Sequence, residues 1–323
     1  MEVKRIPEST YDVVIIGGGP GGLTAGIYAA RGGLKALLIE GAATASQIMV
    51  TDLIENYPGM PEGMNGYDLI ERFKKQALQF GLEIRSGDVT AIGKAHQGDM
   101  DGWEVLTGAG STFGALAVIV ATGAYWRKLG VPGEETFIGK GVSYCATCDG
   151  PFCRNREVVV VGGGDTAIQE ALFLTNFATK VTVVHRRHRL RASGILQKRA
   201  FANKKIEFAW NAAVDEITGG NFVEGVRIRD VGNPDVKREI PAEGVFIFVG
   251  LIPNTAIMKG LIDLDENGYI RTDNHMQTST PGIFACGDCI SKRLRQVVTA
   301  CGDGATAAFS AQLYVDDVKG EAY

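Results

Sequence analysis

The sequence predicts an α/β protein in which two units of similar layout share one chain, the second inserted into the first. Each unit opens with an apolar run, a glycine-rich turn and a stretch of helical spacing. The two turns are Gly17-Gly18-Gly19-Pro20-Gly21-Gly22 and Gly162-Gly163-Gly164-Asp165-Thr166-Ala167. Each unit also closes on an apolar strand that ends at a glycine. Because 323 residues suffice for about two domains, this repetition indicates a two-domain chain.

The first unit begins with a β-α-β pattern. A continuous apolar run at Asp12–Ile16 is typical of a buried parallel strand. Residues Leu23–Arg31 have helical spacing, and Ala36–Glu40 is the next apolar run. A glycine turn between a buried strand and a helix is the context in which a dinucleotide fingerprint carries meaning.

The residues of this turn match the needs of a bound pyrophosphate. Gly17 allows the tight turn, Gly19 allows the backbone to approach the pyrophosphate, and Gly22 allows the helix to pack on the strand. With Pro20 they form the start of the helix, where free N–H groups and the helix dipole favour anions. Glu40 ends the second strand, where a carboxylate can accept the ribose hydroxyls of an adenosine. The first unit is therefore predicted to bind a dinucleotide.

The rest of the first unit alternates turns with short elements. An amphipathic helix is expected from about Tyr67 to Gly81, after a turn signal at Glu55-Asn56-Tyr57-Pro58-Gly59. Strand patterns follow at Val89–Ile92, Trp103–Leu106 and Leu116–Val120. The last of these runs into Ala121-Thr122-Gly123.

The second unit repeats this layout. Its expected elements are strands at Glu157–Val161, Val181–Val184, Val214–Ile217, Val226–Ile228 and Val245–Gly250, and a helix at Thr166–Asn176. The chain then returns to the first unit, with a strand at Gly282–Ala285 and a helix of small residues at Gly304–Tyr314. We expect two Rossmann-like, three-layer ββα nucleotide-binding domains, residues 1–123 with 252–323 and residues 124–251.

The two units differ at the adenosine end. Where the first has Glu40, the second has His185-Arg186-Arg187, with Arg191 close behind. A carboxylate there would repel a 2′-phosphate, whereas guanidinium groups bind it as bidentate donors. The second unit is therefore predicted to bind NADPH.

A compact dithiol lies between the two fingerprints, at Cys145-Ala146-Thr147-Cys148-Asp149. Two cysteines at this spacing can open and close as a disulfide. Zinc ligands share the spacing, and Cys286 with Cys289 forms a second such pair. Zinc ribbons place their pairs about 15–20 residues apart, far closer than these two pairs, and the four histidines show no metal spacing. We expect a redox dithiol and no metal.

Composition and charge exclude several classes of protein. A net charge of −4 argues against nucleic acid as the main partner. No stretch approaches the length of a transmembrane helix, and the N-terminal residues lack the apolar core of a signal peptide. Six cysteines in so long a chain do not indicate a secreted disulfide scaffold. We expect a cytoplasmic protein with no membrane partner.

Taken together, these motifs resemble, over nearly the whole length, those of the low-molecular-weight, bacterial-type thioredoxin reductases, which are class II pyridine nucleotide-disulfide oxidoreductases. The matching stretches are Gly17 to Gly22, Glu55 to Gly59, Ala121 to Gly123, Cys145 to Asp149, Gly162 to Ala167, His185 to Arg187 with Arg191, Pro253-Asn254-Thr255, and Gly287-Asp288. The resemblance implies a homodimeric, NADPH-dependent flavoprotein that reduces the disulfide of thioredoxin.

The resemblance also implies residue roles. Cys148 would lie against the flavin, Cys145 would attack the partner's disulfide, and Asp149 would protonate the leaving thiolate. The implied FAD contacts are Gly17, Gly19, Pro20, Gly22, Glu40, Gln47, Asn56, Thr122, Gly123, Asp288, Arg295, Gln296 and Val297. The implied NADPH contacts are Gly162, Gly164, Asp165, Thr166, Ala167, His185, Arg186, Arg187 and Arg191.

The chain departs from the family pattern in places. Ser46 stands where the family usually has a glycine, and Cys286, Cys289 and Cys301 are extra thiols, which we interpret as small, semi-buried fillers. The arginines argue against ferredoxin-dependent or deazaflavin-dependent relatives and dithiol oxidases, which lack NADPH. The cysteine pair argues against ferredoxin–NADP reductases of this fold. A glutaredoxin-like or peroxidase partner in place of thioredoxin stays open.

The position of the dithiol predicts a moving domain. It belongs to the inserted unit, which two crossings join to the flavin unit, near Gly123 to Gly130 and near Gly250 to Pro253. Glycines there tolerate the backbone changes that a hinge needs. We expect rotation about these crossings to bring either the dithiol or the nicotinamide against the flavin.

Overall fold

The structure is a computed structural model, in which residues 10–41, 47–50, 54, 56–97 and 100–321 are described. The chain divides into two compact units: Met1–Tyr125 with Ile252–Tyr323 (unit 1), and Trp126–Leu251 (unit 2). It passes between them at β7 (Ala124–Trp126) and β16 (Leu251–Pro253), which pair as a two-stranded sheet. Gly123, Gly130 and Gly250, near these crossings, have positive φ angles of 67°, 74° and 123°.

Unit 1 is built on a mixed sheet with the strand order β3-β2-β1-β6-β5-β4. Strands β3, β2, β1 and β6 are parallel, β17 pairs in parallel with the last residues of β6, and β4, β5 and the start of β6 are antiparallel. The strands are β1 (Thr10–Ile16), β2 (Ala36–Glu40), β3 (Glu83–Ser86), β4 (Val89–Gln97), β5 (Met100–Thr107), β6 (Thr112–Val120) and β17 (Ile283–Ala285).

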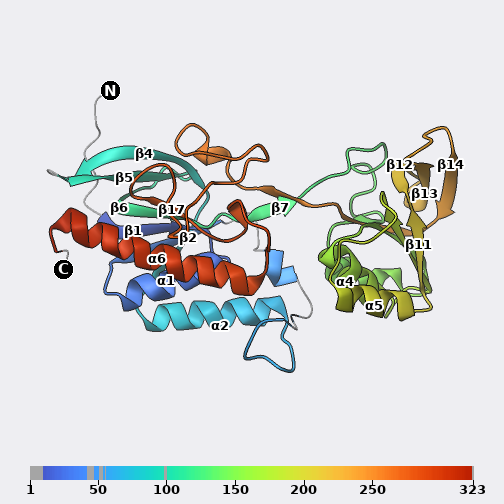
Figure 1. The fold of residues 1–323 in the computed structure, drawn as a ribbon, viewed down its shortest axis with the longest axis horizontal. Helices are drawn as coiled ribbons and strands as arrows, with labels where there is room; N and C mark the ends of the chain where they lie inside the picture. The colour runs from blue at the N-terminus through green and yellow to red at the C-terminus, as the bar shows by residue number, and fades with distance from the viewer. Residues whose placement is uncertain (1–9, 42–46, 51–53, 55, 98–99, 322–323) are drawn as a thin grey trace. The chain divides into compact units, whose positions relative to one another are not determined.

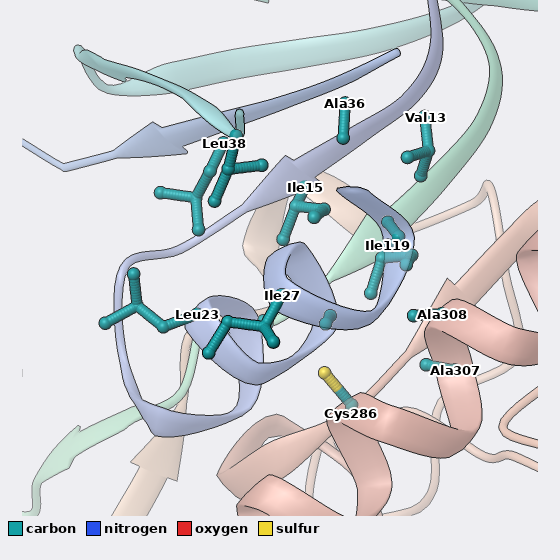
Figure 2. Close-up of a cluster of buried hydrophobic side chains, with 14 of the residues drawn as sticks. Val13, Ile15, Leu23, Ile27, Ala36, Leu38, Ile119, Cys286, Ala307 and Ala308 are labelled. Atoms are coloured by element: carbon teal, nitrogen blue, oxygen red, sulfur yellow. The ribbon is translucent and has the colours of Figure 1, made fainter. Parts of the chain in front are cut away.

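Helices α1 (Pro20–Arg31), α2 (Gly66–Gln79) and α6 (Val297–Lys319) lie together on one side of this sheet (Figure 1). Alternate residues of each strand divide between two cores. Val13 and Ile15 belong to the core against the helices, which Figure 2 shows, whereas Val14 and Ile16 belong to the core on the opposite face. Burial on both faces explains the continuous apolar runs in the sequence.

Unit 2 is a parallel sheet with the order β11-β10-β9-β15-β8, covered on one face by α4 and α5 and on the other by the antiparallel sheet β12-β13-β14. Its elements are β8 (Val142–Ser143), α3 (Ala146–Asp149), β9 (Glu157–Gly162), α4 (Asp165–Leu174), β10 (Lys180–His185), α5 (Gly194–Ala202), β11 (Ile206–Trp210), β12 (Ala212–Gly219), β13 (Val223–Asp230), β14 (Lys237–Pro241) and β15 (Gly244–Phe248). The predicted α/β class with two nucleotide-binding folds is confirmed.

The sequence underestimates one helix. The prediction was a helix over Gly304–Tyr314, whereas α6 runs from Val297 to Lys319. Its start is fixed by a capping box between Gln296 and Thr299, and its end by Gly320 in the left-handed conformation. Glycine lowers helix propensity, yet Gly304 is needed, because a Cβ there would lie 2.1 Å from the Gly21 carbonyl oxygen on α1.

Other elements escaped prediction because their sequence signals are short. Strand β3 has only four residues, and α5 lacks a helical pattern of buried residues, with Ala200 alone of its described residues buried. The single-turn helices η1 (Gln47–Val50), η2 (Gly150–Cys153), η3 (Ala256–Met258) and η4 (Gly287–Cys289) complete the described elements. None of the helices in the described residues is both long and apolar enough to cross a membrane.

Candidate cofactor and dithiol sites

The glycine turn of unit 1 admits no side chain at its key positions. Gly17 has φ +117°, and a Cβ there would lie 2.2 Å from the Ala121 carbonyl oxygen. A Cβ on Gly22 would lie 1.9 Å from the Gly17 carbonyl oxygen. The turn is therefore packed backbone against backbone, which brings the start of α1 close to the ends of β1 and β6.

The N-terminus of α1 offers hydrogen-bond donors. Gly19 is the N-cap, with an extended backbone and no side-chain cap, and Pro20 is the first helical residue. The first-turn N–H groups thus have no side-chain acceptor of the usual kind, as expected where a ligand's phosphate oxygens take that place. The turn fits a pyrophosphate.

Glu40 lies beside this turn, at the end of β2. A Cβ on Gly18 would meet the Glu40 Cβ at 2.8 Å and its Oε2 at 2.9 Å. On its other side, Oε2 is 2.9 Å from the Lys74 Nζ on α2. Lys74 was not anticipated from the sequence, and it fixes the carboxylate at the edge of the turn.

Asp288 has the geometry of a ligand-binding residue. It follows Gly287, which has φ +78°, in the single-turn helix η4. Its Oδ1 atom is buried and has no hydrogen-bond partner among the described residues. Burial raises the pKa of this carboxyl, although Lys292 and Arg295 lower it. Because orphaned buried acceptors are rare in native proteins, the atom fits a ligand hydroxyl, as on the ribityl chain of FAD.

Two of the predicted flavin contacts, far apart in sequence, meet in the structure. Asn56 Nδ2 donates to Gln296 Oε1 over 2.8 Å, and Gln296 is the N-cap of α6, directly before Val297. The guanidinium of Arg295 donates to the Asp288 and Ile290 carbonyl oxygens and lies 4.0 Å from the centre of the Tyr269 ring.

Thr122 and Gly123 are tied to the segment that returns to unit 1. The Thr122 hydroxyl donates to the Asn254 carbonyl oxygen over 2.6 Å, and Asn254 N donates to the Gly123 carbonyl oxygen over 2.9 Å. Gln47 begins η1, but its side chain lies outside the described part of the structure, as does the whole of Ser46.

The glycine turn of unit 2 repeats the plan of the first. Gly162 has φ +151°, and a Cβ there would lie 2.4 Å from the Phe248 carbonyl oxygen and 2.7 Å from the Ala167 Cβ. Gly164 is the N-cap of α4, with no side-chain cap, and faces open space. Asp165 starts α4, and its Oδ1 accepts a hydrogen bond of 2.5 Å from Ser193 N. Thr166 follows it in the first turn of α4. The open space at Gly164 leaves room for a pyrophosphate.

The basic residues at and after the end of β10 form two sets, one buried and one exposed. His185 is buried, its Nε2 lies 3.0 Å from the Arg189 carbonyl oxygen, and its ring fills the space below Gly163. Burial lowers its pKa, so the ring is a neutral support under the turn. Arg186, Arg187 and Arg191 are exposed, and none of them pairs with a carboxylate among the described residues. Arg191 N donates to the Gly163 carbonyl oxygen, which places Arg191 over the turn.

The dithiol segment lies in unit 2, where the chain enters α3. Cys145 is half-buried and disulfide-bonded, and its N–H donates to the Ser143 hydroxyl. Cys148 stands on α3, but its side chain is outside the described part, so its pairing with Cys145 stays a prediction. Asp149 ends α3, and its N–H donates to the Cys145 carbonyl oxygen.

A buried carboxylate anchors this segment. The Glu134 side chain accepts hydrogen bonds from Leu129 N, Gly130 N and the Tyr144 hydroxyl, the last over 2.6 Å. Tyr144 directly precedes Cys145, and burial together with this hydrogen bond raises its pKa. The anchor joins the dithiol segment to the loop that follows β7, and it was not anticipated from the sequence.

The remaining cysteines are free thiols. Cys286 and Cys289 are fully buried, and the Cys286 side chain points toward α1, as Figure 2 shows. Cys153 is buried and Cys301 is half-buried. Burial raises the pKa of each of these four thiols, as expected for small apolar fillers. In the described residues, no three His, Cys, Asp or Glu side chains are grouped to hold a metal ion.

Known proteins match this chain over nearly all of its length. Residues 11–304 match the pyridine nucleotide-disulphide oxidoreductase family. A thioredoxin reductase of Listeria monocytogenes is 48% identical over 316 residues, which cover 97% of this chain and 96% of that protein.

Two solved structures are also similar. The thioredoxin reductase of Lactococcus lactis in its FR conformation has a TM-score of 0.90 and 44% identity, over 95% of this chain and 99% of that one. The thioredoxin reductase of Streptococcus pyogenes has a TM-score of 0.64 and 46% identity, over 96% of this chain and 100% of that one. The chain belongs to the pyridine nucleotide-disulphide oxidoreductase family, and within it to the thioredoxin reductases, as its sequence motifs predicted.

Proposed function

We propose that the chain is an NADPH-dependent flavoprotein that reduces the disulfide of thioredoxin, with FAD in unit 1 and NADPH in unit 2. The observation that carries this proposal is a disulfide-bonded Cys145 in the unit whose glycine turn is lined by exposed arginines. The other unit has an acid at its turn, and its Asp288 Oδ1 has no hydrogen-bond partner among the described residues, so this unit is suited to FAD.

Different residues of unit 1 bind different parts of FAD. The N-terminus of α1, with Gly17, Gly19, Pro20 and Gly22, takes the pyrophosphate. Glu40 accepts the adenosine ribose hydroxyls, and Asp288 accepts a hydroxyl of the ribityl chain. The residues assigned to the flavin ring and its surroundings are Gln47, Asn56, Thr122, Gly123, Arg295, Gln296 and Val297.

In unit 2 the N-terminus of α4 takes the NADPH pyrophosphate, at Gly162, Gly164 and the residues Asp165, Thr166 and Ala167. Arg186, Arg187 and Arg191 bind the 2′-phosphate, since their guanidinium groups are exposed and pair with no carboxylate of the described residues. The buried His185 ring packs against the glycine turn and supports it.

When bound, NADPH and FAD supply the electron pair that opens the enzyme disulfide. The opened pair holds Cys145 and Cys148 as one thiol and one thiolate. Cys145 then attacks one sulfur of the thioredoxin disulfide, whose S–S bond breaks as a mixed disulfide forms, and Asp149 protonates the leaving thiolate. Cys148 attacks the Cys145 sulfur, which restores the enzyme disulfide and releases the thioredoxin dithiol.

Turnover requires unit 2 to rotate against unit 1, because one small dithiol must meet both a flavin and a protein. The crossings at β7 and β16 supply the hinge, with Gly123, Gly130 and Gly250 at positive φ. Two thioredoxin reductases of similar identity to this chain, 44% and 46%, superpose on it with TM-scores of 0.90 and 0.64. Movement of whole units would produce such a difference.

We further propose that the protein is a homodimer and that it is located in the cytoplasm, which is a reducing compartment.

The test is oxidation of NADPH by the purified protein with thioredoxin from the same source. The wild type should be yellow and should turn over with thioredoxin. Cys145→Ser and Cys148→Ser should each lose this turnover completely, yet still pass electrons to a small acceptor that reacts with the flavin. Thioredoxin turnover by either variant would contradict the proposal. A glutaredoxin-like protein, assayed in parallel, tests the alternative partner.

A further inference from the structure

A lysine lies in the interior of unit 1, next to the acid that we assign to FAD. The Lys292 side chain is only 13% exposed. Its Nζ lies 2.6 Å from Asp303 Oδ2, 3.3 Å from the Thr299 hydroxyl and 3.8 Å from Asp288 Oδ1. Burying a lysine costs free energy unless its charge is paired. The buried position of Lys292 therefore indicates a specific role.

Asp303 holds two groups at once. Its Oδ2 atom accepts the hydrogen bond from Lys292 and a second one, of 3.2 Å, from Gly287 N. Gly287 has φ +78° and begins η4, which carries Asp288. The carboxylate of α6 therefore fixes both the backbone in front of Asp288 and the ammonium group beside it.

The distances decide which acid the lysine pairs with. At 2.6 Å the contact with Asp303 is a hydrogen bond, whereas 3.8 Å to Asp288 is too long for one. The ammonium group therefore attracts the Asp288 charge without occupying its Oδ1 lone pair, and Oδ1 stays without a partner among the described residues. Such an acceptor is available to a ligand hydroxyl.

The Asp288 carboxylate also depends on the positive charge of Lys292 to stay ionised. The charged groups that act on it are Lys292 and Arg295, which lower its pKa, and Asp303, which raises it. Arg295 directs its guanidinium to backbone carbonyl oxygens and the Tyr269 ring. Without Lys292, the Asp288 carboxylate would share a largely buried site with Asp303, and no other ammonium group of the described residues is among the charges that act on it.

We propose that Lys292, held by Asp303, is a positioning residue that keeps the Asp288 carboxylate charged and its Oδ1 free to accept a hydroxyl of bound FAD. The role rests on the proposed function, since it assumes that Asp288 binds FAD. Neither Lys292 nor Asp303 touches the cofactor in this role, as both act through Asp288.

The test is the dissociation constant of FAD, measured on the full chain between pH 4.5 and pH 8 from the fluorescence of free FAD. At pH 7, Lys292→Met should raise this constant by about ten- to a hundredfold, since a charge-assisted hydrogen bond is lost. Lys292→Arg should restore most of the affinity. Lys319→Met is the matched control, because Lys319 likewise pairs with an aspartate, Asp12 over 2.8 Å, at the other end of α6 from Asp288, and it should leave FAD binding unchanged.

The pH dependence separates this role from a general loss of structure. The ionised Asp288 is the better acceptor, so FAD binding weakens as pH falls through the Asp288 pKa. Lys292→Met removes a group that lowers this pKa, and the weakening should begin at higher pH than in the wild type. Asp303→Asn removes a group that raises it, and the weakening should move to lower pH. Asp288→Asn should lack this pH dependence.

Opposite shifts in the two variants are expected from the charge arrangement and not from damaged packing. A dissociation constant for Lys292→Met within twofold of the wild type, or equal midpoints in all variants, would overturn the inference. A wild type that binds no FAD would instead remove the proposed function on which it rests.

Discussion

The two glycine turns share a backbone plan but differ in what surrounds them. In unit 1 the second strand ends at Glu40, which pairs with Lys74. In unit 2 the second strand ends at His185, which is buried, and exposed arginines follow it. The N-cap glycines are alike, since Gly19 and Gly164 both have extended backbones and no side-chain cap.

This comparison separates what binds any dinucleotide from what selects one. The turn and the helix start supply N–H groups for a pyrophosphate in both units. The charge at the end of the second strand selects the adenosine half, a carboxylate for free ribose hydroxyls and guanidinium groups for a 2′-phosphate. The following predictions test the comparison, from the largest expected effect to the smallest.

The largest effect is expected at a glycine that the turn of unit 1 needs for packing, at the position where the turn of unit 2 has Ala167. Gly22→Ala should lower the free energy of unfolding by about 3 kcal/mol or more, because its Cβ would overlap the Gly17 carbonyl oxygen. Gly164→Ala faces open space and should leave stability unchanged. Thermal unfolding measures both. Equal melting temperatures in the two variants would show that the close packing of the first turn is not needed.

The arginines should decide between the two nicotinamide cofactors. The double variant Arg186→Ala with Arg187→Ala should raise the KM for NADPH by about tenfold or more, since each charge-assisted contact contributes about 1.5–3 kcal/mol. The KM for NADH should change little. Steady-state kinetics with both cofactors measures the ratio, and equal losses for the two would contradict the assignment of the 2′-phosphate site.

A smaller effect is expected where the acid of unit 1 is held in place. Lys74→Met should weaken FAD binding by about two- to fivefold, because the ion pair is partly exposed and such pairs contribute up to about 1 kcal/mol. Glu40→Gln should weaken it more, because the amide lacks the charge. FAD dissociation measured by fluorescence compares the two. Stronger weakening by Lys74→Met than by Glu40→Gln would show that the lysine binds FAD itself.

The smallest effect is a pH dependence of stability in unit 2. Burial lowers the pKa of His185 below its ordinary value of 6.5, so the unfolded chain binds more protons there than the folded one. Stability from this group is present above about pH 6.5 and is lost as pH falls through the lowered folded-state pKa. The His185→Gln variant should therefore lose less stability on acidification, a difference in melting temperature on the order of 2 °C. Parallel curves for the two proteins would contradict a buried, neutral His185.

The sequence by itself determined the fold class, the two glycine turns, the opposite charges beside them and the dithiol. These follow from local rules, because strand and helix periods, glycine at positive φ and short motifs are written in neighbouring residues. The same rules failed at α6, where the sequence predicted a start at Gly304. Its true start is marked by a capping box between Gln296 and Thr299, in which the usual residue types of the two positions are exchanged, so the common sequence signature is missing.

Only the tertiary structure decided which distant side chains meet. Asn56 reaches Gln296, Ser193 N reaches Asp165, and Lys292 is placed between Asp288 and Asp303. None of these contacts has a periodic signal, because each depends on how separate elements pack and not on spacing within one. The sequence therefore identified the residues whose chemistry suits the cofactors. The packing of α6 and η4 on the sheet determined which of these residues contact one another.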